Sequence, residues 1–371
     1  MKYYMIAGEA SGDLHASNLM KELKKLDQEA EFRCWGGDLM LAEGAVLVKH
    51  YRDLAFMGFV EVIANLPTIL RNFKVCKKDL IAYKPDALIL IDYPGFNLRM
   101  AEYAKKKGLK VYYYISPQIW AWKQSRVKQI KEFVDRMFVI LPFEKEFYKK
   151  FDYKVDFVGH PLLDAIADLK TASTKIKDDK PIIALLPGSR KQEILRILPL
   201  MLELSKKYAD YRFIIAAAPS IDNHFYTELT KDFDVDIVFN NTYALLSKAK
   251  AALVTSGTAT LETALFEVPE VVCYKGGNIS YQIAKKLIKV KFISLVNLVM
   301  DKEIVKELIQ DELNVENLFT ELNKILMDKQ LRLEMAENYL QLKEKLGGKG
   351  ASAKTANFIY KDLNKIKSLE N

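Results

Sequence analysis

The chain of 371 residues is poor in the residue types that build metal centres and disulfide frameworks. It contains three cysteines and four histidines, and the cysteines (Cys34, Cys76, Cys273) are widely separated, with no C-x-x-C pair. This excludes a disulfide framework and a cysteine-type zinc site, and it suits a reducing compartment. So few histidines argue against a histidine-rich metal centre. We therefore expect neither a metal nor another cofactor.

Long apolar runs are also lacking. No segment reaches the roughly 18–20 apolar residues that a membrane-spanning helix requires. The apolar run after Lys2 ends at Gly8 and Glu9, which is too short for a signal peptide. We expect a cytoplasmic protein that does not span a membrane.

The charge is unbalanced toward the basic side. The formal net charge is +8, which favours acidic partners such as nucleotide phosphates, nucleic acid or an anionic membrane surface. Solubility alone also explains most individual lysines. The sequence has no pattern of aromatic residues interleaved with basic ones, as RNA-binding surfaces have, so we expect no nucleic-acid partner. It also lacks G-x-S-x-G, H-E-x-x-H and Walker A motifs, which argues against serine hydrolases, zinc proteases and P-loop enzymes.

What the chain does contain is a regular alternation of short apolar runs and amphipathic stretches such as Leu14–Leu26. Continuous apolar runs are typical of parallel strands that are buried on both faces. The alternation predicts an α/β protein with two Rossmann-like, doubly wound domains, a number that suits the length. The predicted strands are residues 3–7, 87–91, 111–115, 136–140, 182–186, 212–216, 236–239, 251–255 and 270–273.

Composition predicts the domain boundaries. After Gly159-His160-Pro161 the pattern gives way to a polar stretch from Lys170 to Lys180. Near the end, Gly347, Gly348 and Gly350 precede a helical pattern from about 351 to 366. We expect an N-terminal domain over residues 1–165, a second over 166–346, and a final helix over 347–371. This helix would pack back on the first domain or be exchanged with another subunit.

Two loops in the first half follow strands, at the edge where open α/β sheets bind ligands. The loop Gly8–Asp13 could present a helix N-terminus to an anion, or could be a turn in which Asp13 caps the helix. Asp92 directly follows the strand 87–91, where a general base could lie, although an Asx-turn explains it equally simply. Trp120 and Trp122 follow another strand and could pack in the core or line a wall for a sugar or acyl chain.

The second half has two loops suited to phosphate. Gly188-Ser189-Arg190 and Ser256-Gly257-Thr258 each follow a strand and precede a helix, and an arginine fork can grip a diphosphate. Glu262 lies one turn after Thr258 and could accept hydrogen bonds from ribose hydroxyls, or could simply cap a helix start. A further apolar segment, 54–70, is followed by basic residues and could be a core helix or an interfacial one.

Seven motifs stand in register along nearly the whole chain: Gly8–Asp13, 91–97, Ser116–Trp122, Leu141–Lys145, Gly159-His160, Leu186–Arg190 and Ser256–Glu262. In these motifs and their order the chain resembles the lipid-A-disaccharide synthase family. The resemblance implies a GT-B glycosyltransferase whose two domains face a central cleft. It also implies inverting transfer from UDP-2,3-diacylglucosamine to 2,3-diacylglucosamine 1-phosphate, giving a β-1,6-linked disaccharide 1-phosphate and UDP.

The resemblance also implies roles for residues. Asp92 becomes the leading candidate for the catalytic base, with Glu9, Asp13 and His15 as rivals. Some relatives have a second aspartate at the position of Gly95. The implied nucleotide-binding residues are Gly188, Ser189, Arg190, Ser256, Gly257, Thr258, Glu262 and Asn297, although Val296 stands where the family motif has proline. The implied acceptor and lipid contacts are Gly8, Ser11, Gly12, His15, Met57, Trp120 and Trp122.

The family further implies contact with the anionic inner membrane surface, peripheral association and a homodimer. Two alternatives remain open from the residues alone. One is another GT-B enzyme of UDP-sugars, such as a UDP-N-acetylglucosamine epimerase. The other is a non-catalytic membrane-binding protein.

Overall fold

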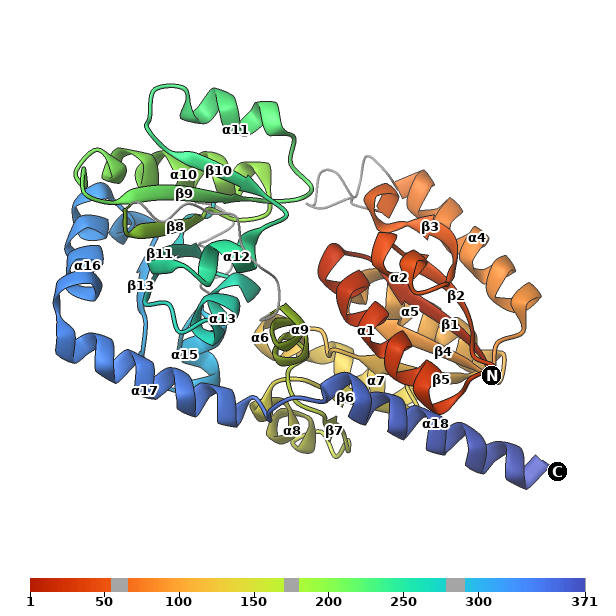
Figure 1. Cartoon of the computed structure of the whole chain (residues 1–371). Coiled ribbons are helices and arrows are strands. Elements are labelled where there is room, and N and C mark those ends of the chain that lie inside the picture. The colour runs from red at the N-terminus through yellow and green to blue at the C-terminus, as the bar shows by residue number, and fades with distance from the viewer. Residues whose placement is uncertain (55–65, 170–179, 278–290, 371) are drawn as a thin grey trace. The chain divides into compact units, whose positions relative to one another are not determined.

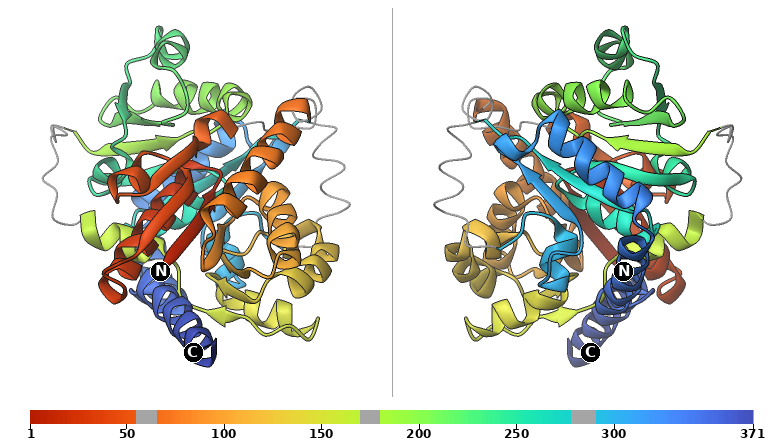
Figure 2. Two further views of the ribbon diagram at one scale, coloured as in Figure 1. Left: turned by 90° about the vertical axis from the view of Figure 1, so that its right-hand side faces the viewer. Right: turned by 90° about the vertical axis from the view of Figure 1, so that its left-hand side faces the viewer.

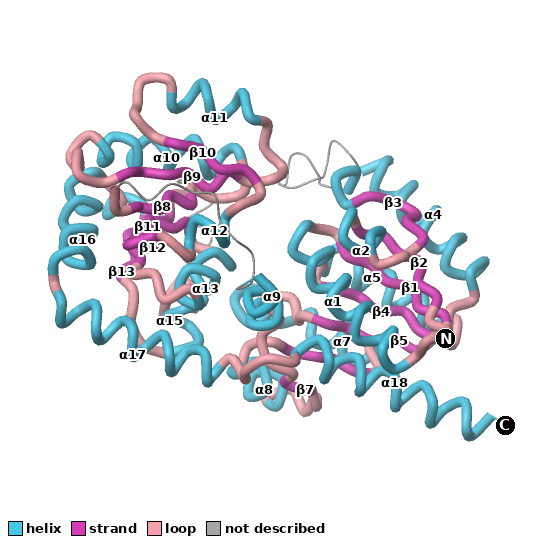
Figure 3. The backbone as a smooth tube through the Cα atoms, viewed as in Figure 1, coloured by secondary structure: helices cyan, strands magenta, loops and turns pink. Residues whose placement is uncertain are grey.

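The computed structural model describes residues 1–54, 66–169, 180–277 and 291–370. The chain forms two compact units (Figure 1): unit 1 comprises residues 1–165 and 347–371, and unit 2 comprises residues 166–346. Each unit has one parallel sheet, and strands alternate with helices along the chain (Figure 3). The predicted α/β class with two doubly wound sheets is confirmed.

Unit 1 is built on a seven-stranded sheet of order β3-β2-β1-β4-β5-β6-β7. Its strands are β1 (Lys2–Ala7), β2 (Glu31–Gly36), β3 (Val46–His50), β4 (Ala87–Ile91), β5 (Lys110–Tyr114), β6 (Arg136–Val139) and β7 (Asp156–Phe157). Its helices are α1 (Ala10–Leu26), α2 (Asp38–Ala42), α4 (Leu66–Tyr83), α5 (Pro94–Lys106), α6 (Ile119–Trp122), α7 (Val127–Phe133), α8 (Pro142–Lys149) and α18 (Ala351–Glu370), with 3-10 turns η1 (Tyr51–Leu54) and η2 (Gln124–Arg126). The helix α9 (Leu162–Leu169) spans the boundary between the units.

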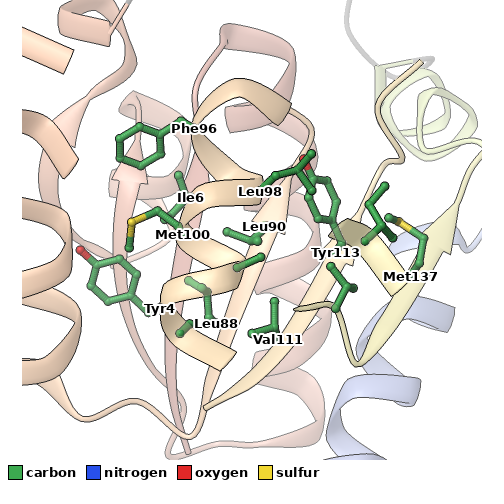
Figure 4. Packing of buried hydrophobic residues seen from close by; sticks show 14 of the residues in the cluster. Tyr4, Ile6, Leu88, Leu90, Phe96, Leu98, Met100, Val111, Tyr113 and Met137 are labelled. Carbon is green, nitrogen blue, oxygen red and sulfur yellow. The ribbon is translucent and has the colours of Figure 1, made fainter. Parts of the chain in front are cut away.

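Helices cover both faces of this sheet (Figure 2). On one face, alternate strand residues such as Tyr4, Leu90 and Tyr113 pack against Phe96 and Met100 of α5 (Figure 4). The strand residues between these, such as Phe138, point to the other face, which α1 and α18 cover. Burial on both faces explains why the strands are apolar at successive positions.

The C-terminal helix α18 packs on unit 1 of its own chain. The Asp164 carboxylate accepts hydrogen bonds from the backbone N–H groups of Gly350 (2.6 Å) and Ser352 (3.1 Å) at the start of this helix. Further along, Arg136 forms an ion pair with Asp362 at 3.0 Å, and its guanidinium lies 4.1 Å from the centroid of the Phe358 ring. Charge and aromatic contacts therefore hold the helix at both its start and its middle.

Unit 2 has a six-stranded sheet of order β10-β9-β8-β11-β12-β13. Its strands are β8 (Ile182–Leu186), β9 (Arg212–Ala217), β10 (Asp236–Phe239), β11 (Ala249–Thr255), β12 (Glu270–Tyr274) and β13 (Lys306–Ile309). Its helices are α10 (Lys191–Ser205), α11 (Asn223–Thr230), α12 (Thr242–Leu246), α13 (Thr258–Leu265), α15 (Leu295–Met300), α16 (Val315–Met327) and α17 (Lys329–Lys345), with a 3-10 turn η3 (Gln310–Glu312).

All nine predicted strands are present, and their ends differ by at most two residues. β5 stops at Tyr114 because Ile115 has φ +67°, outside the extended region. The described strands β2, β3, β7 and β13 were not predicted. The helix expected from Leu14 begins at Ala10, which rules out the alternative in which Asp13 caps it. Among the described helices, none is both long and apolar enough to cross a bilayer.

Candidate active site

A cavity of about 1020 Å³ opens in unit 2 at the carboxyl ends of its central strands. Loops after β8, β9, β10 and β11 form its walls, together with the first turns of α12 and α13. The predicted residues that line it are Gly188, Ser189, Ser256, Gly257, Thr258 and Glu262. This is the edge at which open parallel sheets bind nucleotides.

The loop after β8 depends on a glycine. Gly188 has φ +113°, and a Cβ at this position would lie 3.0 Å from Oε2 of Glu193. Arg190 is the residue before α10, and its guanidinium is held by Glu193 at 3.0 Å. Glu193 lines the cavity, whereas Arg190 does not. Arg190 therefore lies beside the cavity, paired with one of its acidic residues.

The loop after β11 leads into α13 with little side-chain bulk. Gly257 is the N-cap of this helix and has no side chain to satisfy its first N–H groups. Ser256 is turned away from them, since its hydroxyl donates to the carbonyl of Ile293 at 2.8 Å. The start of α13 therefore presents backbone N–H groups at the cavity, an arrangement suited to an anion.

Glu262 forms part of the cavity wall on α13. Burial raises the pKa of its carboxyl, and a hydrogen bond from the hydroxyl of Tyr243, at 3.1 Å, opposes that rise. Tyr243 also lines the cavity and stacks on Phe266, with ring centroids 5.6 Å apart. Our sequence analysis missed Tyr243, although its place just after the predicted strand 236–239 puts it at the same edge of the sheet.

Asn297 does not line this cavity, and its role in nucleotide binding stays a prediction. Its side chain is fully buried on α15. The amide nitrogen donates to the carbonyl of Val305 and to Glu307, both at 2.9 Å. The amide oxygen accepts from the N–H groups of Ile304 and Val305. Its hydrogen-bonding groups are thus used inside unit 2, where they hold the turn before β13.

In unit 1 the candidate residues gather at the carboxyl ends of β1, β4 and β5. Asp92 and Tyr93 follow β4 with φ values of 44° and 49°, a left-handed pair that stores backbone strain. The ring of Tyr93 lies over Gly8, where a Cβ would come within 2.3 Å of it. Only glycine therefore fits at the end of β1, because the strained turn places an aromatic ring there.

The environment of Asp92 changes its acidity. Burial raises the pKa of its carboxyl to about 7, the negative charge of Glu9 adds to the rise, and a backbone hydrogen bond from Tyr93 opposes it. The carbonyl oxygen of Asp92 accepts hydrogen bonds from Asn97 (2.8 Å) and from the hydroxyl of Tyr113, which hold the turn. A carboxyl on a fixed turn, with a pKa near neutrality, suits a general base.

Asp13, predicted as a rival of Asp92 for the role of catalytic base, makes structural contacts. Its carboxylate is buried and accepts hydrogen bonds from the N–H groups of Gly37 (2.8 Å), Leu39 (3.0 Å) and Met40 (3.1 Å). These groups lie at the start of α2, so Asp13 on α1 ties that helix in place. With three backbone donors bound to it, this carboxylate is poorly placed to accept a substrate proton.

His15 is buried on α1 beside another buried histidine, His160. Burial lowers the pKa of His15 to about 4, and burial together with His15 lowers that of His160 to about 3. Both rings are therefore neutral at neutral pH. Near them, Gly12 is buried, and a Cβ there would lie 3.2 Å from that of Ala7. Of the residues predicted in this loop, Ser11 is exposed.

The aromatic loop after β5 packs against α8. Trp120 makes an edge contact with Phe143, with ring centroids 4.9 Å apart, and the hydroxyl of Ser116 lies 2.7 Å from that of Tyr148. Beneath them lies Glu144, whose pKa burial raises to about 8 against hydrogen bonds from the backbone of residues 140 and 141. Glu144 was not predicted as a functional residue. Met57 and the side chain of Trp122 lie outside the described residues.

Metal-binding geometry is not found in the described part of the chain. There, no group of three or more histidine, cysteine, aspartate or glutamate side chains could hold a metal ion.

Two α/β units, each with one parallel sheet, and a cavity at the strand ends of unit 2 define the GT-B fold. Solved structures share this fold at low identity. The UDP-GlcNAc 2-epimerase from Neisseria meningitidis, bound to UDP-GlcNAc, aligns with a TM-score of 0.70 and 16% identity over 97% of this chain and 100% of that chain. The glycosyltransferase of kitacinnamycin aligns with a TM-score of 0.68 and 14% identity over 98% and 99%.

Sequence similarity identifies the family within the GT-B fold. Residues 3–360 match the family model described as lipid-A-disaccharide synthetase. The lipid-A-disaccharide synthase of Geobacter sulfurreducens is 38% identical over 372 residues, which cover 97% of each chain. The chain therefore belongs to the lipid-A-disaccharide synthase family and is a hexosyltransferase.

Proposed function

We propose that this protein joins UDP-2,3-diacylglucosamine to 2,3-diacylglucosamine 1-phosphate, giving the β-1,6-linked disaccharide 1-phosphate and UDP. The family match over residues 3–360 carries this proposal. The cavity in unit 2 supports a nucleotide donor there, and the half-buried carboxyl at the end of β4 supports an acceptor in unit 1.

The proposed chemistry is a single displacement with inversion. The acceptor 6-hydroxyl oxygen attacks the anomeric carbon of the donor while the bond to UDP breaks. Asp92 takes the hydroxyl proton, and Glu9 raises the basicity of Asp92. Charge develops on the leaving diphosphate, where the backbone N–H groups at the start of α13 and the guanidinium of Arg190 stabilise it.

Donor choice separates this function from that of an epimerase of the same fold. We expect disaccharide 1-phosphate from the two acylated substrates, and no change in UDP-N-acetylglucosamine incubated alone. Mass spectrometry of the first reaction and proton NMR of the second would report both products. Inversion at C2 of UDP-N-acetylglucosamine, without formation of disaccharide, would favour the epimerase.

We also propose that unit 1 contacts an anionic membrane through α4, since both substrates carry acyl chains. This helix buries Phe73, Cys76 and Leu80 and exposes Leu66, Leu70 and Val75 by 44–49%. Exposed basic residues lie among these apolar ones on the same helix: Arg71, Lys74 and Lys78. Apolar side chains with a basic flank are typical of helices that lie in a membrane interface.

Vesicle sedimentation tests this surface. The wild type should bind phosphatidylglycerol vesicles more strongly than phosphatidylcholine vesicles, and Lys74→Glu with Lys78→Glu should weaken that binding. Lys128→Glu with Lys150→Glu is the matched control, because these lysines are exposed elsewhere on unit 1. Equal loss in both double variants would show that net charge, and not α4, governs binding.

The predicted homodimer remains a proposal of family resemblance. Light scattering of the purified protein in detergent would give the mass, for which a dimer predicts twice the 42.6 kDa of one chain.

A further inference from the structure

Tyr243 and Glu262 meet in the wall of the unit 2 cavity. Tyr243 lies on α12, after β10, and Glu262 lies on α13, after β11. The tyrosine hydroxyl donates to Oε1 of the carboxylate at 3.1 Å, and both residues line the cavity. The contact thus joins two helices that begin at the ligand-binding edge of the sheet.

The tyrosine is held in place independently of that hydrogen bond. Its ring stacks on Phe266, with centroids 5.6 Å apart and planes 29° apart. A ring fixed on one face can direct its hydroxyl without losing further side-chain freedom. Tyr243 therefore has the properties of a group that orients its neighbour.

We infer that Tyr243 is a positioning residue that makes the cavity select a ribonucleotide over a 2′-deoxyribonucleotide. It does so by holding Oε1 of Glu262, which leaves Oε2 directed at the vicinal hydroxyls of the ribose. This rests on the proposed function, in which a uridine nucleotide occupies the cavity.

A wall without this hydroxyl would bind ribose less well for two reasons. The carboxylate would rotate among several conformations, so binding of the ribose would have to fix it in one of them, at a cost in conformational entropy. The half-buried carboxylate of Glu262 would also lose a donor that favours its ionised form, which is the better acceptor. A site built to bind a hydroxyl discriminates strongly against a ligand that lacks it, so the loss should appear as lost selectivity.

Tyr243→Phe tests this, since it keeps the ring on Phe266 and removes only the hydroxyl. Calorimetry would give Kd values for UDP and 2′-deoxy-UDP. We expect UDP binding to weaken about three- to tenfold and 2′-deoxy-UDP binding to change less than about twofold. In turnover, KM for the donor should rise while kcat changes little. Glu262→Gln should lose the same selectivity, and the double variant should lose little more.

Tyr208→Phe is the matched control. Its hydroxyl also binds a side chain of unit 2, Asn323 at 2.9 Å, but it does not line the cavity. It should leave the UDP to 2′-deoxy-UDP ratio unchanged. If Tyr243→Phe binds UDP with the ratio of the wild type, the inference is wrong while the proposed function stands. If the wild type itself fails to bind UDP, the proposed function fails and the inference with it.

Discussion

Asp92 combines a left-handed backbone, a half-buried carboxyl and a neighbouring negative charge, each of which costs stability. Such costs collect where a function requires the geometry. We therefore expect Asp92→Asn to keep UDP affinity, because the donor cavity lies in unit 2. It should lower kcat roughly 10²–10⁴-fold, the usual contribution of a general base. Turnover of the variant at the wild-type rate would remove Asp92 from the mechanism.

The acidity of Asp92 predicts a pH profile. A base must be ionised, so kcat/KM should fall as pH drops through the pKa of about 7. Glu9 raises that pKa, so Glu9→Gln should move the acidic limb to lower pH. Rates measured over about four pH units, from pH 5 to 9, would show the shift of the acidic limb. An unmoved limb would mean that Glu9 does not act on the titrating group.

Arg190 tests the diphosphate site. Its guanidinium must leave or share Glu193 to reach a phosphate, so its role rests on a movement of one side chain. We expect Arg190→Ala to weaken the binding of UDP about five- to fiftyfold, as the loss of a hydrogen bond to a charged group would. Arg196→Ala, an exposed arginine on the same helix, should bind UDP like the wild type. Unchanged affinity in Arg190→Ala would count against its phosphate role.

At the scale of elements, the position of α18 depends on Asp164, whose carboxylate accepts hydrogen bonds from two N–H groups at the start of that helix. Asp164→Ala should destabilise unit 1 by about 1–2 kcal/mol, a typical cost for the loss of a cap. Urea unfolding followed by tryptophan fluorescence reports on this unit, because all three tryptophans lie in residues 1–165. The control Glu146→Ala changes an exposed pair on α8 and should cost less than about 0.5 kcal/mol. Equal midpoints for both variants would show that Asp164 does not hold α18.

Whether a strand could be predicted from the sequence depended on how fully it is buried. Strands buried on both faces, such as β4 and β8, are apolar throughout and were found from the sequence. The strands β3 and β13 lie at sheet edges and contain charged residues, which hides their pattern. The site was predicted only where a loop followed a recognised strand. The contact of Tyr243 with Glu262 and the structural role of Asp13 depend on contacts between separate elements, which periodicity does not report.

For the whole molecule, the two units divide the proposed work between donor and acceptor. The sequence match shows the family. Solved structures of both epimerases and glycosyltransferases share the fold at similar TM-scores. Fold alone could therefore not have distinguished these activities. The roles of single residues remain predictions that the variants above test.

The most direct test is turnover of UDP-2,3-diacylglucosamine with 2,3-diacylglucosamine 1-phosphate in detergent, with EDTA present. We predict equal amounts of disaccharide 1-phosphate and UDP, at a rate that EDTA does not change. UDP binding without disaccharide, under conditions in which both lipids are dispersed, would contradict the proposed reaction.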